Sequence, residues 1–181
     1  MIKRKKKTTK KEKEYYEIIK TRVEELFKRK VNDFLFEITA NKKFNEQLKY
    51  EIPKNRAIIF SFLKKAPPDI TGFTKIGSSS YFIVVDVKKD KIKLEDIYQL
   101  RKYRDLFNAK FAFLISLRPI PAEIKRLCEL EFNILFHSSW SYPYLTLVSV
   151  DEKMLPHINN AKDVFIDWFP ENPFENDRYW R

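Results

Sequence analysis

Three ionisable residues that are able to do chemistry stand beside strongly apolar stretches of the chain. Asp69 follows Pro68, and Asp86 and Lys88 close the apolar run YFIVVDVK. Because successive side chains of a strand alternate between its faces, Asp86 and Lys88 project from the same face as Val84. A charge buried against such a strand is costly unless it is paired or binds a metal. The spacing therefore indicates a functional cluster rather than packing alone.

The two acids are expected to meet if their strands pair. A strand that begins at Asp69 can fold back through the turn at 77–80 onto the strand that ends at Lys88. Two adjacent carboxylates repel, and a cation between them relieves the repulsion. Few oxygen ligands suit Mg²⁺, for which Mn²⁺ substitutes, because this ion keeps several waters and is completed by substrate phosphates. With Lys88 alongside, the cluster fits metal-assisted hydrolysis of a phosphodiester bond.

These residues also carry a resemblance. Pro68-Asp69 followed by Asp86-Val87-Lys88 resembles the PD-(D/E)xK nuclease superfamily. Gln99 and Tyr103, one turn apart on the expected helix 94–107, are similar to the QxxxY motif of its RecB-like and CRISPR-associated exonuclease branch; the Holliday junction resolvase-like branch is the other resemblance. The resemblance implies a Mg²⁺-dependent deoxyribonuclease with metal ligands Asp69 and Asp86, a catalytic Lys88, a catalytic Gln99 and a substrate-binding Tyr103.

The same family implies a glutamate on the first helix, which several residues could supply. Glu12 shares a helical face with Tyr16 and is the first choice for a catalytic metal ligand, although it also completes a capping box with Thr9. Glu17 is the second choice. Lys89 faces away from Lys88 and is expected to contact DNA or solvent.

Charge favours a polyanionic partner. The chain has 181 residues and a formal charge of +11, and its residues 1–13 hold eight Lys or Arg against one Glu. Such an arm is either a solubilising tail or a segment that follows nucleic-acid phosphates. Binding to DNA is therefore one expectation. A non-catalytic nucleic-acid-binding protein that retains the nuclease fold is the alternative, and an assembly subunit is a third hypothesis.

Other classes of protein are disfavoured. Cys128 is the one cysteine, so the four-cysteine iron–sulfur cluster of some relatives in that branch is not expected. No stretch approaches the roughly 18–20 apolar residues that cross a bilayer, and the charged N-terminus does not resemble a secretory signal. The expectation is a cytoplasmic protein without a membrane partner.

The pattern of elements predicts an α/β protein with a central mixed sheet flanked by helices. Helices are expected from Thr9 to about Lys30, at 94–107 and at 121–130, whereas 31–50 fits either helix or strand. The expected strands are 57–63, 69–73, 81–89, 110–117, 133–136 and 145–150. This order agrees with the restriction-endonuclease-like αβββαβ core that the resemblance implies.

The domain organisation has three expected parts. A flexible basic arm covers 1–13, a nuclease-like domain covers 14–160, and an aromatic tail covers 161–181. Residues 162–169 space their aromatics like a sliding-clamp-binding peptide but begin with Lys162 instead of glutamine. Clamp binding is therefore disfavoured, and the aromatics are expected to pack on the domain or on a second subunit in a homodimer.

Overall fold

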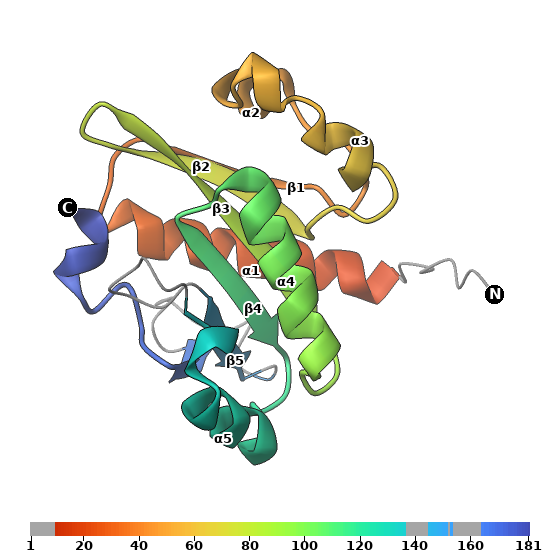
Figure 1. Ribbon diagram of the computed structural model, residues 1–181, viewed down its shortest axis with the longest axis vertical. Helices are drawn as coiled ribbons and strands as arrows, with labels where there is room; N and C mark the ends of the chain where they lie inside the picture. The colour runs from red at the N-terminus through yellow and green to blue at the C-terminus, as the bar shows by residue number, and fades with distance from the viewer. Residues whose placement is uncertain (1–9, 137–144, 152, 154–163) are drawn as a thin grey trace.

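A single mixed sheet forms the centre of this computed structural model, which describes residues 10–136, 145–151, 153 and 164–181, without the side chains of 10–13 and Phe132. Within these residues the sheet has six strands in the spatial order β1-β2-β3-β4-β5-β6 (Figure 1). The strands are β1 (Phe34–Ile38), β2 (Ile70–Ile76), β3 (Ser79–Lys88), β4 (Phe111–Ser116), β5 (Thr146–Val150) and β6 (Phe165–Phe169). β3, β4 and β5 run parallel, and the other neighbours are antiparallel.

Helices cover both faces of this sheet. The helices are α1 (Lys10–Lys28), α2 (Glu46–Glu51), α3 (Ile59–Leu63), α4 (Leu94–Phe107) and α5 (Ala122–Leu130). The 3-10 turns are η1 (Lys54–Arg56), η2 (Phe132–Ile134) and η3 (Asp177–Trp180). In Figure 1, α1 runs behind the sheet and α4 crosses its front. Buried residues of α2 to α5 share one core, and those of α1 form the other. The expected α/β class with a central mixed sheet is confirmed.

The core under α1 is built from the apolar face that the sequence predicted. Its buried residues are Tyr16, Ile19, Val23, Leu26 and Phe27. The C-terminal segment closes this core, since the Phe27 ring lies 5.1 Å from Phe174 and 5.3 Å from Trp180, centroid to centroid. α1 is therefore fixed between the sheet and the end of the chain.

The core on the other face depends on α4, whose bounds match the expected helix 94–107. Its buried residues include Ile97, Leu100, Tyr103 and Phe107, at helical spacing. Asn108 ends the helix in the left-handed region, with φ of 48°, where asparagine is tolerated. This packing lays the N-terminal half of α4 across the carboxyl end of β3.

The hairpin of β2 and β3 forms as the sequence predicted. Gly77 makes the turn with φ of +60°, a conformation that a side chain disfavours. The pairing runs from Ile76 opposite Ser79 to Ile70 opposite Val85. Val84 faces the α4 core, whereas Val85 and Val87 face the α1 core, so the two faces of β3 are those expected.

Two expected strands are wrong. Residues 57–63 form the end of a turn and α3 instead of the first strand, because Ile59 and Leu63 are buried while Ile58 and Phe62 are exposed, which is a helical repeat. The first strand is β1, inside the stretch that had fitted either helix or strand. The expected strand 133–136 is also wrong, since 133 and 134 belong to η2, which follows closely on α5, and 135 and 136 are not in a strand.

The aromatic C-terminal residues belong to the sheet. β6 pairs antiparallel with β5, and Phe165 is buried under α1. The Trp168 indole N–H donates to the Phe165 carbonyl at 2.8 Å, which turns its ring against the same core. Lys162 and Asp163 lie outside the described residues. The aromatics of 164–169 therefore pack on the domain, and the clamp-binding interpretation has no free peptide to rest on.

Candidate active site

Asp69 and Asp86 lie opposite each other on adjacent strands. The β2–β3 pairing ends with Ile70 opposite Val85, so the next residues outward are these two acids, on the face covered by α4. Both are buried, with 4% and 1% of their surfaces exposed. The backbone N–H of Val87 donates to Asp69 Oδ2 at 2.8 Å. The hairpin thus brings together the two carboxylates that the sequence singled out.

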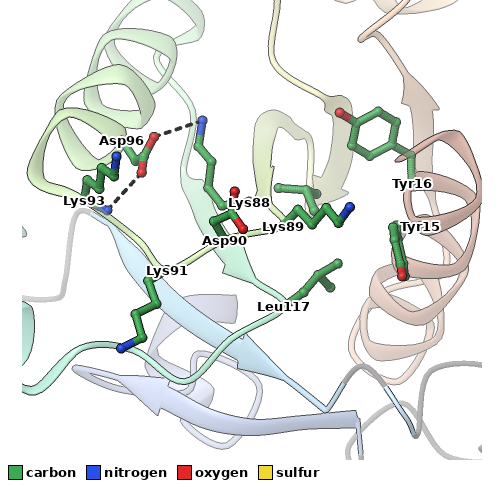
Figure 2. A pocket seen from close by; sticks show the side chains of 10 residues that line it. Tyr15, Tyr16, Lys88, Lys89, Asp90, Lys91, Lys93, Asp96 and Leu117 are labelled. Carbon is green, nitrogen blue, oxygen red and sulfur yellow. Dashed lines mark hydrogen bonds and ion pairs between the residues drawn. The ribbon is translucent and has the colours of Figure 1, made fainter. Parts of the chain in front are cut away.

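Lys88 is paired with acids on both sides. Its Nζ lies 2.7 Å from Asp86 Oδ2 and 3.1 Å from Asp96 Oδ1. Asp96 also accepts the backbone N–H of Lys93 at 2.9 Å, which caps the start of α4 (Figure 2). Burial alone lowers the pKa of the Lys88 ammonium, but the Asp86 and Asp96 carboxylates outweigh it and raise that pKa above its ordinary value. Lys88 therefore stays protonated beside the acid pair.

Gln99 connects α4 to the same carboxylate. Its Nε2 lies 3.3 Å from Asp86 Oδ2, 3.5 Å from Oδ1 and 3.2 Å from the Tyr103 hydroxyl. Tyr103 is fully buried, and burial, followed by the charges of Asp86 and Asp69, raises its pKa. Tyr103 consequently contacts Gln99 from the buried side and has no exposed surface for direct contact with a substrate.

A threonine that sequence reasoning missed holds Asp69 from the other side. The Thr39 backbone N–H donates to the Asp69 carbonyl at 2.9 Å, and its hydroxyl donates to the Pro68 carbonyl at 2.8 Å. The same hydroxyl lies 2.8 Å from Thr71 Oγ1. Thr39 follows β1, in the stretch whose structure the sequence left open, so no signal pointed to it.

The donor set suits a hard cation with few protein ligands. Asp69 and Asp86 are buried carboxylates at the same end of the β2–β3 hairpin, and Mg²⁺ is commonly held by one or two carboxylates with waters and phosphates as its other ligands. Across the described residues, no group of three or more His, Cys, Asp or Glu side chains gathers as a metal site. A divalent cation would therefore depend on the acid pair, and would compete with the Lys88 ammonium for Asp86.

The other expected site residues lie around this centre. Glu12 belongs to α1, but its side chain is outside the described part of the structure. Glu17 is exposed, while Tyr16 on the same helix is buried. Lys89 is exposed and points towards Tyr15 and Tyr16, away from Lys88 (Figure 2).

A pocket of about 280 Å³ lies beside Lys88 and Asp96. Its walls come from α1, from the end of β3 with the following loop, and from the start of α4 (Figure 2). The lining residues are Tyr15, Tyr16, Val87, Lys88, Lys89, Asp90, Lys91, Lys93, Asp96 and Leu117. Lys88 and Asp96 thus belong both to the acid cluster and to the pocket.

Comparisons with family models, with curated proteins and with solved structures find no match for this chain. The assignment of a function therefore depends on the geometry above. Over the part of the chain that the structure describes, no helix combines the length and apolar character needed to span a membrane.

Proposed function

We propose that the protein is a metal-dependent nuclease that hydrolyses phosphodiester bonds of DNA. The observation that carries the proposal is the position of Asp69 and Asp86, buried on facing strand ends with the Lys88 ammonium 2.7 Å from Asp86. Burying two like charges side by side is unfavourable, and a cation bound between the two carboxylates would offset their repulsion.

Each residue of the cluster has a defined task in this proposal. Asp69 and Asp86 hold Mg²⁺ or Mn²⁺, and the cation, when bound, supplies Lewis-acid stabilisation of the charge that develops on the phosphate. Lys88 also contacts Asp96, so it would stay at the site if a cation took its place at Asp86. Its ammonium would there stabilise the negative charge that develops on the phosphate.

Gln99 and Tyr103 act as positioning residues. The Gln99 amide bonds to both oxygens of Asp86, which fixes the plane of that carboxylate. Tyr103 in turn holds the amide through a 3.2 Å contact from the buried side of α4. A carboxylate with a fixed plane presents its oxygens to a cation with little loss of side-chain entropy.

The experiment is cleavage of labelled single-stranded and duplex DNA in Mg²⁺ or Mn²⁺. Wild type should cleave, and Asp69→Asn and Asp86→Asn should each lose at least about 100-fold in rate, because each removes a charged ligand of the cation. Asp105→Asn is the matched control, since Asp105 is an exposed aspartate at the far end of α4. Calorimetric titration with Mn²⁺ should show binding by wild type and Asp105→Asn only.

A non-catalytic nucleic-acid-binding protein is the second candidate. It is favoured by the absence of a third acid or histidine ligand among the described residues, and by the contact of Lys88 with Asp86 in the place a cation would take. It predicts DNA binding that weakens with salt, survives Asp86→Asn and needs no metal. Equal cleavage by wild type and both acid variants, or no cleavage by any, would decide against the nuclease.

A further inference from the structure

We infer that the pocket beside the acid pair receives an unpaired nucleotide, so that the DNA cut by this protein is single-stranded or frayed at the site of cleavage. This inference rests on the proposed nuclease function, since it places the nucleotide that neighbours the scissile phosphate.

The pocket extends from the acid cluster, past the carboxyl end of β3, to the α1 side of the sheet. Asp86 and Lys88 lie on the α4 side of the strand, and Val87 and Lys89 lie on the α1 side. Figure 2 shows Lys88 directed at Asp96 and Lys89 directed at the tyrosines of α1. A DNA strand with its phosphate at the acid pair would therefore pass over the strand end and place its next nucleotide in the pocket.

The walls of the pocket match the surfaces of a nucleobase. Tyr15 and Tyr16 contribute rings, and Val87 and Leu117 contribute an apolar floor. Tyr15 is only partly buried, whereas Tyr16 is 6% exposed and belongs to the core. Every base has an apolar aromatic face, so stacking on such rings is favourable and independent of sequence.

The charge on the rim of the pocket is opposite to that of the DNA backbone. Asp96 is engaged by Lys88 and by the Lys93 backbone N–H. Around the rim, Lys89, Lys91 and Lys93 outnumber the one remaining acid, Asp90, and Lys89 is directed at the tyrosines in Figure 2. This positive excess favours a phosphate next to the stacked base.

The size of the pocket favours a single strand over a duplex. About 280 Å³ is close to the lower limit of ligand pockets, and it has no space for a stacked base pair with its neighbours. A base within a duplex would have to leave its stack and its partner, at a cost of a few kcal/mol, roughly. A strand that is already unpaired avoids this cost, and binds in preference.

The test measures binding of the full chain in EDTA, so that cleavage plays no part. Fluorescence anisotropy compares a labelled single strand with a blunt hairpin duplex of the same composition. The single strand should bind at least about tenfold more tightly, and Tyr15→Ala should remove about tenfold of that affinity, the effect of losing one stacked base. Tyr15→Phe, which keeps the ring, should retain the preference.

Two further variants separate stacking from charge. Lys89→Ala should weaken binding of both DNAs and lower the slope of affinity against salt by about one unit. Tyr50→Ala is the control, because Tyr50 is a tyrosine of α2, 87% exposed, that does not line this pocket. Equal binding of single strand and duplex, or an unchanged preference in Tyr15→Ala, overturns the inference.

Failure of the inference and failure of the nuclease proposal give different results. Cleavage of blunt duplex at the same rate as single strand, lost in Asp86→Asn, would refute the single-strand inference and leave the nuclease standing. A Tyr15-dependent preference for single strands without any metal-dependent cleavage would support the pocket and refute the nuclease.

Discussion

Replacement of Lys88 by methionine tests the electrostatics of the cluster most directly. The change keeps a long apolar stem and removes the charge that lies 2.7 Å from Asp86, whose surface is 1% exposed. Removing one partner of a buried pair costs about 3–5 kcal/mol. Because the Gln99 amide still bonds to Asp86 and the Lys88 side chain is 14% exposed, we expect the lower part of this range, about 3 kcal/mol.

The assay is urea unfolding of wild type, Lys88→Met, Asp86→Asn and the double variant in EDTA. The double variant should lose less than the two single variants together, because the methionine then faces a neutral amide. Lys91→Met, which alters an exposed lysine of the same loop, should change stability by less than about 0.5 kcal/mol. Additive effects, or a loss below about 1 kcal/mol in Lys88→Met, would refute the view that Lys88 neutralises a buried acid.

The same series repeated with Mn²⁺ tests the metal site. A cation at one hundred times its dissociation constant stabilises the folded state by about 2.7 kcal/mol. In Lys88→Met the competing ammonium is gone, so the stabilisation by Mn²⁺ should equal or exceed that of wild type, and should vanish in Asp86→Asn. If Mn²⁺ stabilises neither wild type nor Lys88→Met, the acid pair does not hold a divalent cation.

Two other expectations concern the scaffold. A Cβ on Gly72 would lie 2.4 Å from the Leu35 carbonyl oxygen and 2.6 Å from the Phe36 ring. Gly72→Ala should therefore destabilise the fold by about 3 kcal/mol in urea unfolding. An unchanged midpoint would contradict the β1–β2 register. The pKa values of Lys88 and Tyr103 are raised, so the folded state keeps protons that the unfolded chain loses, and stability should fall as pH rises above about 10. Tyr103→Phe should flatten this fall between pH 10 and 11, and an equally steep fall in the variant would contradict the buried position of the hydroxyl.

Local sequence patterns predicted those elements whose structure is determined by residues close together in the sequence. In α4, the apolar repeat from Ile97 to Phe107 matches the helical period. In the β2–β3 hairpin, a turn at Gly77 joins two segments that are rich in β-branched and aromatic residues. Because Asp69, Asp86, Lys88 and Gln99 all belong to these two units, the prediction could bring them together.

The parts that depend on distant contacts were not predictable. Residues 59–63 are large and apolar except for Ser61, and whether such a short run is helix or strand is decided by what covers it. β1 is short, and its place at the sheet edge is set by pairing with β2. Thr39 supports Asp69 only once that pairing exists, so its contribution had no signature in the sequence.

The contact of Lys88 with Asp86 means that this carboxylate has a positive partner even when no cation is bound. Without a cation, the ammonium compensates the buried acids, and the fold does not depend on metal for its electrostatics. If a cation took the place of the ammonium at Asp86, Lys88 would still have Asp96 at the start of α4 as its partner and would stay at the site. In the proposed nuclease, Asp96 would thus hold the positive charge of Lys88 near an arriving phosphate. Asp96→Asn should therefore weaken Mn²⁺ binding in calorimetric titration, because Lys88 would be left with Asp86 as its one carboxylate partner and would compete harder with the cation for it.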